Sequence, residues 1–300
     1  MIKKGNVFVR TDLACEAASC LENIEGTEYS KKDADGCSIE RLKIITEDTA
    51  RKLGKKCGCY VTLKTRELWK IYDEDIDRLA CIVGDELKRL ICLSINKDSL
   101  PAETSVLIAG LGNSRITADA IGPETVSRLT VTRHIKELDP SLFKKLEMCE
   151  LSAIAPGVFG ETGIESADLV QAAAQKIKPH LIIVIDALAA GSIERLACTV
   201  QISDTGINPG AGIGNLRCEL SRDTLGIPVI ALGVPTVVDT SSVVYDAICR
   251  VGASDNISDE LKNHLERSER FYVTPKESDL ITEKVSMLLA RSISHALGIF

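Results

Sequence analysis

The sequence predicts an α/β fold in which a mostly parallel β-sheet is flanked by helices. In the middle of the chain, short apolar runs alternate with segments of helical periodicity, an order typical of βαβ units and parallel strands. Hydrophobic residues make up 45% of the chain but aromatic residues only 4%. The core is therefore aliphatic, which suits strands that are buried on both faces.

The expected elements follow one another along 300 residues without an internal repeat or a low-complexity linker, so one domain is expected. Apolar alternation and continuous apolar runs predict strands at 7–9, 42–45, 60–63, 105–109, 151–154, 181–185, 199–202 and 228–232. Apolar spacings of three and four predict helices over 75–96, 123–138, 165–177, 240–251 and 278–297.

Charge and cysteine usage exclude several classes of protein. A net charge of −7 argues against direct nucleic-acid binding, which needs a basic surface. The eleven cysteines are scattered, without a CxxC pair or zinc-finger spacing, and no apolar signal segment follows Met1. We expect most of them to be small buried hydrophobic residues in a reducing cytoplasm. The longest apolar run, 181–190, contains Asp186 and is too short to span a bilayer, so no membrane partner is expected.

Two aspartates follow two of the predicted parallel strands. Asp186 comes directly after the strand at 181–185, and Asp119 lies in the loop after the strand at 105–109. In open α/β sheets the site lies beyond the carboxyl ends of the strands, so both should reach one crest. Two carboxylates in one cleft can divide the work of amide hydrolysis, one activating water and the other donating a proton. The alternative for each aspartate is a helix N-cap.

A second group of residues is predicted to bind substrate or support the aspartate pair. Its members are Gly112, Asn113, Glu161, Asp204, Gly212 and Asn215. The last three belong to a glycine-rich segment, 204–215, which is either a set of tight turns or a rim whose backbone N–H groups approach the substrate. A nucleotide-binding module is a further alternative, but Arg115 stands where a GxGxxG fingerprint needs its third glycine.

Several long motifs resemble the germination protease family of spore-forming bacteria. They include VRTDLACE (9–16), GLGNSRITADAIGP (110–123), APGVFGETGIE (155–165), DALAAGS (186–192) and QISDTGINPGAGIGNLR (201–217). The resemblance covers nearly the whole chain. It implies a fold like that of the hydrogenase maturation peptidases, with extra N-terminal strands. It also implies an atypical aspartic endopeptidase without a cofactor, whose catalytic aspartates match Asp119 and Asp186.

The same resemblance implies a substrate and a life cycle. Family members degrade small acid-soluble spore proteins in the spore core during germination, and are made as homotetrameric zymogens that remove a propeptide by self-cleavage. They cut after an acidic residue that is followed by an apolar residue and Ala. Asp12-Leu13-Ala14 has this pattern. Self-cleavage is therefore predicted between Asp12 and Leu13, which makes 1–12 a propeptide and 13–300 a single α/β peptidase domain; the alternative is an edge strand and turn.

The chain also departs from the family pattern, and one alternative mechanism stays open. Ala118 replaces a common Pro, Gly191 replaces a common Arg, and Cys57 and Cys59 replace a common Pro and Asn. The alternative is a metal-dependent peptidase on the same scaffold, as in the hydrogenase maturation relatives. Its metal ligands would be the two aspartates together with Glu161 or His134.

Overall fold

The computed structural model describes residues 2–4, 7–9, 11–19, 25–210, 218–252, 258–267 and 271–299. Its strands are β1 (Ile2–Lys4), β2 (Val7–Val9), β3 (Thr27–Ala34), β4 (Cys37–Ile44), β5 (Gly58–Lys64), β6 (Ser105–Gly110), β7 (Glu150–Ile154), β8 (Leu181–Ala190), β9 (Thr199–Ser203), β10 (Val229–Asp239) and β11 (Tyr272–Val273).

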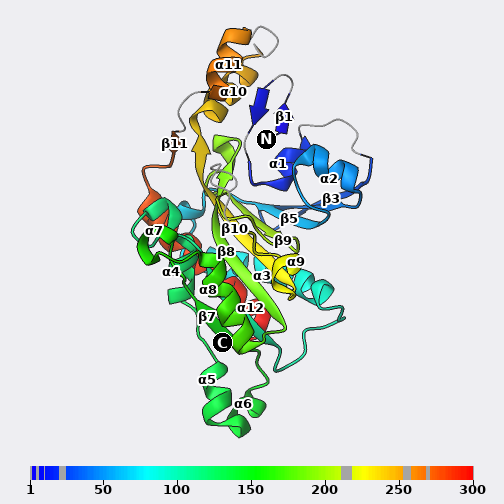
Figure 1. Ribbon diagram of the computed structural model, residues 1–300, viewed down its shortest axis with the longest axis vertical. Helices are drawn as coiled ribbons and strands as arrows, with labels where there is room; N and C mark the ends of the chain where they lie inside the picture. The colour runs from blue at the N-terminus through cyan, green and yellow to red at the C-terminus, as the bar shows by residue number, and fades with distance from the viewer. Residues whose placement is uncertain are drawn as a thin grey trace.

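The helices surround one large sheet (Figure 1). They are α1 (Ala14–Ser19), α2 (Glu47–Leu53), α3 (Asp73–Ser94), α4 (Ile121–Ser127), α5 (Arg133–Leu138), α6 (Pro140–Leu146), α7 (Phe159–Thr162), α8 (Ser166–Ile177), α9 (Arg222–Leu225), α10 (Thr240–Arg250), α11 (Asp259–Arg267) and α12 (Ser278–Leu297). Short 3-10 turns are η1 (Leu68–Lys70), η2 (Thr117–Asp119) and η3 (Ile193–Arg195).

In the part of the chain that the structure describes, the sheet has nine strands, with a parallel half and an antiparallel half. This confirms the α/β class and makes the sheet mixed. The strand order is β3-β4-β5-β9-β10-β8-β6-β7, and β11 pairs with β10. Parallel pairing joins β10 to β8, β8 to β6 and β6 to β7. The N-terminal strands β3, β4 and β5 form an antiparallel extension that reaches β10 through β9.

The central strand β8 is buried on both faces, as its continuous apolar run predicts. Because side chains alternate along a strand, Ile183 and Ile185 join the core that α3 and α12 cover. Ile182 and Val184 instead join the core that includes Val170 of α8. The parallel half is therefore a three-layer sandwich that holds β8 rigidly.

Most predicted elements are confirmed, but the helix predicted over 123–138 is wrong. The chain forms α4 and α5 instead, and leaves the helix between them because Thr132 bonds to the neighbouring strand β7. The Thr132 amide donates to Leu151 O at 3.0 Å, and the Leu151 amide donates to Thr132 Oγ1 at 2.8 Å. The periodicity of the sequence did not reveal this pairing, because it depends on a strand 17 or more residues away.

Two composition-based predictions can be compared with the structure. The cysteines among the described residues are free thiols, but only Cys15, Cys37 and Cys149 of these are buried, so the prediction that most cysteines are buried is wrong. In the described parts of the chain, no helix combines the length and the apolar character that crossing a membrane requires.

Candidate active site

Asp186 lies inside strand β8 and not beyond its end, so the predicted strand boundary at Ile185 is wrong. The strand continues to Ala190 because β10 runs beside it and pairs Val238 with Ala190. Asp186 stands opposite Gly233 of β10 and is 6% exposed, and its Oδ1 accepts a hydrogen bond from the Ala187 amide at 3.0 Å. A carboxylate on a central strand is held more rigidly than one on a loop.

Asp119 ends the 3-10 turn η2, and the loop that precedes it folds back against it. The Asn113 amide donates to Asp119 Oδ2 at 2.8 Å, and the Asp119 amide donates to Ile116 O at 2.7 Å. Gly112 has φ +114°, and a Cβ placed there would lie 1.9 Å from Asp119 O. The structure thus places Gly112 and Asn113 directly against Asp119.

The turn η2 is also anchored by two other elements. Thr236 Oγ1 of β10 donates to Ala118 O at 2.7 Å, and Thr282 Oγ1 of α12 donates to Thr117 O at 2.8 Å. These bonds hold the backbone carbonyl groups of the two residues immediately before Asp119. The position of Asp119 therefore depends on packing between the sheet and the C-terminal helix, in addition to its own loop.

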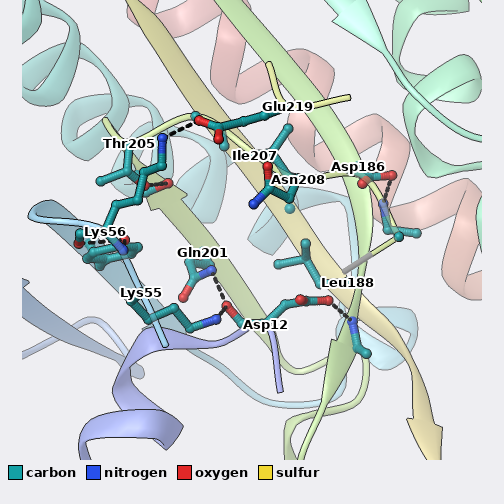
Figure 2. Close-up of a pocket in the computed structure, with 18 of the residues that line it drawn as sticks. Asp12, Lys55, Lys56, Asp186, Leu188, Gln201, Thr205, Ile207, Asn208 and Glu219 are labelled. Carbon is teal, nitrogen blue, oxygen red and sulfur yellow. Dashed lines mark hydrogen bonds and ion pairs between the residues drawn. The ribbon is translucent and has the colours of Figure 1, made fainter. Parts of the chain in front are cut away.

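Asp119 and Asp186 line the same cleft, which has a volume of about 900 Å³. Its wall also includes Asp12, Lys55 and Gln201, which Figure 2 draws around one end of the cleft. A cleft of this size at the carboxyl ends of parallel strands is the usual location of a site in an α/β fold. The two aspartates can therefore act on one substrate.

The predicted cleavage site also reaches this cleft. The Asp12 amide donates to Ala189 O at 2.9 Å, and Asp12 Oδ2 accepts from the Ala189 amide at 2.8 Å. Burial raises the pKa of Asp12, although the charge of Lys55 and the bond from Ala189 oppose the rise. Leu13 is completely buried. The segment thus lies along the part of β8 that follows Asp186.

Other predicted site residues lie elsewhere. Among the described residues, the cleft lining includes none of Glu161, Asp204 and His134. Glu161 on α7 pairs with Arg115 at 3.4 Å, and His134 belongs to α5. Gly212 and Asn215 lie outside the described residues.

Glu161 and His134 do not complete a metal-binding site with the two aspartates, as the metal-dependent alternative requires. Within the described ranges, no three His, Cys, Asp or Glu side chains are grouped so that they could hold a metal ion. A metal-dependent reaction would need ligands other than Glu161 and His134 beside the two aspartates.

Asp204 lies next to the residues of the cleft wall and binds strand β5. Its Oδ1 accepts a hydrogen bond from the Cys59 amide at 2.7 Å, at the start of β5. Burial raises the pKa of Asp204, while its bonds with Cys59 oppose the rise. The neighbouring residues Thr205 and Gly206 line the cleft, so Asp204 links β5 to that wall.

The Asp204→Asn variant is expected to be more stable than the parent at pH 7 and to remain active. A raised folded-state pKa means that the ionised carboxylate destabilises the fold at neutral pH, and that this cost disappears as the pH falls toward 3.8, the ordinary pKa of an Asp side chain. The neutral amide removes the cost and can still accept from Cys59. Urea unfolding between pH 3.5 and 7 measures the difference; a stability advantage that grows as the pH falls would contradict it.

Sequence reasoning missed three residues that the fold brings to the site: Lys55, Gln201 and Thr236. Lys55 precedes a second lysine and resembles an ordinary solvated pair, Gln201 lies within the strand predicted at 199–202, and Thr236 follows the strand predicted at 228–232. Their spacing gave no signal, because their partners are all more than 40 residues away in the chain.

The comparisons of the sequence with known proteins all point to the same family. The family model described as germination protease matches residues 9–272. A germination protease of Clostridium perfringens is 38% identical, covering 96% of this chain and 95% of the relative. One from Priestia megaterium is 45% identical, covering 80% of this chain and 66% of the relative.

A solved structure gives a weaker match. The [NiFe] hydrogenase maturation protease HycI from Thermococcus kodakarensis KOD1 is 16% identical, covering 64% of this chain and 93% of that chain, with a TM-score of 0.30.

The α/β fold, the cleft and the matched relatives together define an endopeptidase. More particularly, the chain belongs to the germination protease family. Its activity is thus that of a peptidase of spore germination.

Proposed function

We propose that this protein is a self-processing endopeptidase that begins the degradation of small acid-soluble spore proteins during germination. It cuts after an acidic residue that is followed by an apolar residue and Ala, and needs no cofactor. The observation that carries the proposal is the presence of Asp119 and Asp186 on the wall of one cleft. Their different supports, a 3-10 turn and a central strand, give the two carboxylates different surroundings, and a division of roles between two carboxylates depends on such a difference.

The proposed reaction is the addition of water to the peptide carbonyl. One aspartate, ionised, takes a proton from water as the water oxygen bonds to the carbonyl carbon. The other aspartate, protonated, donates its proton to the amide nitrogen as the C–N bond breaks. The products are a carboxylic acid and an amine, and the two aspartates have exchanged protonation states. Proton transfer by positioned groups contributes about 10²–10⁴-fold to the rate.

The chain carries a copy of the proposed substrate pattern, which supports self-processing. Asp12, Leu13 and Ala14 are an acidic residue, an apolar residue and Ala in sequence, and Asp12 lines the cleft.

We further propose a homotetramer located in the spore core. Light scattering on the intact and the processed protein tests the assembly, and a mass of one or two chains would overturn it.

Mature, active protein is expected to begin at Leu13. Loss of residues 1–12 follows from cleavage of the Asp12–Leu13 bond, and intact-mass spectrometry of the purified protein during incubation detects it. The Asp186→Asn chain incubated in parallel is the control, because any product formed there comes from a contaminating protease. Full activity in protein that still begins at Met1 or Ile2 would contradict self-processing.

A further inference from the structure

One edge of β8 is left open by its neighbour and is covered by the N-terminal segment. Strand β6 pairs with β8 only as far as Gly110, opposite Ile185. Farther along, the Ala189 amide donates to Asp12 Oδ2 and the Gly191 amide donates to Glu16 Oε2, each at 2.8 Å. Two carboxylates thus satisfy backbone N–H groups that a strand would otherwise pair.

The carbonyl oxygen of Asp12 is held by two side chains. Lys55 Nζ donates to Asp12 O at 2.9 Å and to Thr11 O at 3.1 Å. Gln201 Nε2 donates to Asp12 O at 3.0 Å, while Gln201 Oε1 accepts from the Ala14 amide at 2.7 Å. Gln201 therefore spans the Asp12–Leu13 bond and binds the backbone on both sides of it. We call Lys55 and Gln201 the junction clamp.

The contacts of the clamp are partly shielded from solvent, and the bond between Gln201 and the Ala14 amide is buried. Burial lowers the pKa of Lys55, and the carboxylates of Asp12 and Glu16 oppose this effect. A buried ammonium group needs acceptors, and hydrogen bonds to a charged donor are roughly twice as strong as neutral ones. Beyond the bond, Leu13 and Ala14 are both completely buried. The Asp12–Leu13 bond is thus held on its N-terminal side by hydrogen bonds to Asp12 O and on its C-terminal side by the burial of Leu13 and Ala14.

This fixed position is displaced from Asp186. Ala189, which pairs with Asp12, lies three residues beyond Asp186 on β8, a separation of about 10 Å at the rise of a strand. Figure 2 shows Asp12 with Lys55 and Gln201 at one end of the cleft and Asp186 well apart from them. The bond that self-cleavage would cut therefore has to leave the clamp to reach Asp186.

We propose that Lys55 and Gln201 store the Asp12–Leu13 bond in a non-productive position, and that its release from this clamp limits the rate of self-cleavage. The cleavage step itself rests on the proposed function, whereas the storage contact is a property of the intact chain. Lys55 and Gln201 act here as positioning residues that restrain the junction. Weakening them should therefore speed processing.

The adjacent lysine provides a matched control. Lys56 lines the same cleft, but its Nζ pairs with Glu219 and with Asp223, the latter at 3.5 Å. Lys56→Met removes the same charge at the next position without removing a bond to residues 11–14. Gln201→Glu is the sharper change in the clamp, because it replaces the donor to Asp12 O and keeps an acceptor for the Ala14 amide.

The first measurement tests the clamp alone, by amide hydrogen exchange in an Asp186→Asn chain that does not process itself. Lys55→Met should speed exchange at the Asp12 and Ala14 amides, and Gln201→Glu should speed exchange at the Asp12 amide, each by about tenfold or more, as expected when the hydrogen bonds that hold the junction are lost. Lys56→Met and Lys55→Arg should leave it within about twofold. Unchanged exchange in both clamp variants overturns the proposal.

The second measurement is the rate of self-cleavage with Asp186 restored, read by intact mass. Lys55→Met and Gln201→Glu should process about tenfold faster than the parent, and Lys56→Met at the parent rate. If the clamp variants exchange faster but are not cleaved faster, release from the clamp does not limit self-cleavage, and the proposal is overturned. Slower cleavage in these variants also overturns it, and would indicate that Lys55 and Gln201 assist the cleavage step. Faster exchange with no cleavage in any chain, the parent included, leaves the storage contact standing and instead overturns the proposed function.

Discussion

Asp186→Asn and Asp119→Asn are each expected to abolish self-cleavage and to lower kcat/KM on a peptide spanning residues 7–18 by at least about 10³-fold. Each substitution keeps the shape of the side chain but removes a group that can accept or donate the proton in hydrolysis, and such groups are worth about 10²–10⁴-fold in rate. Asn at 186 can still accept from the Ala187 amide, and Asn at 119 can still accept from the Asn113 amide.

The matched control is Asp204→Asn, which neutralises a half-buried carboxylate outside the cleft lining and should keep activity within about twofold of the parent. Circular dichroism and light scattering establish that each variant has the fold and assembly of the parent. Full activity in either cleft variant would eliminate the two-aspartate mechanism. Activity that survives exhaustive chelation would separate this mechanism from the metal-dependent alternative.

Gly112→Ala should have the second largest effect, through Asp119. The added Cβ would lie 1.9 Å from Asp119 O, and Gly112 has φ +114°, a conformation that L side chains rarely adopt. Turn η2 must therefore shift, and Asp119 with it. Displacement of a catalytic group by about 1 Å can cost about 10²-fold in rate, so kcat/KM should fall by at least that factor. The strain should also lower the free energy of unfolding by about 1–3 kcal/mol.

Gly36→Ala separates displacement from backbone strain. Gly36, in the turn between β3 and β4, has φ +78°, and an added Cβ meets nothing within 4 Å. This variant should lose stability but retain its kcat/KM on the same peptide. If Gly112→Ala loses no more activity than Gly36→Ala, contact between Gly112 and Asp119 does not position the carboxylate.

Part of the fold followed from local pattern. The apolar run at 181–185 predicted a buried central strand, and the periodicity of 75–96 predicted the long helix α3. Both succeed because burial on two faces, or on one helical face, leaves a direct trace in residue order. The apolar run stops at Ile185 and predicts the end of the strand there. Pairing with β10 extends the strand as far as Ala190.

The sequence by itself determined the α/β class and the family, and it singled out Asp119 and Asp186 because each follows an apolar strand run that parallel order brings to one crest. Only the tertiary structure decided that Asp186 is held within a strand, that Thr236 and Thr282 anchor the turn before Asp119, and that the Asp12–Leu13 bond lies in a clamp of Lys55 and Gln201. These contacts join residues 40 or more positions apart. Their formation depends on how strands pair and helices pack, which residue spacing does not encode.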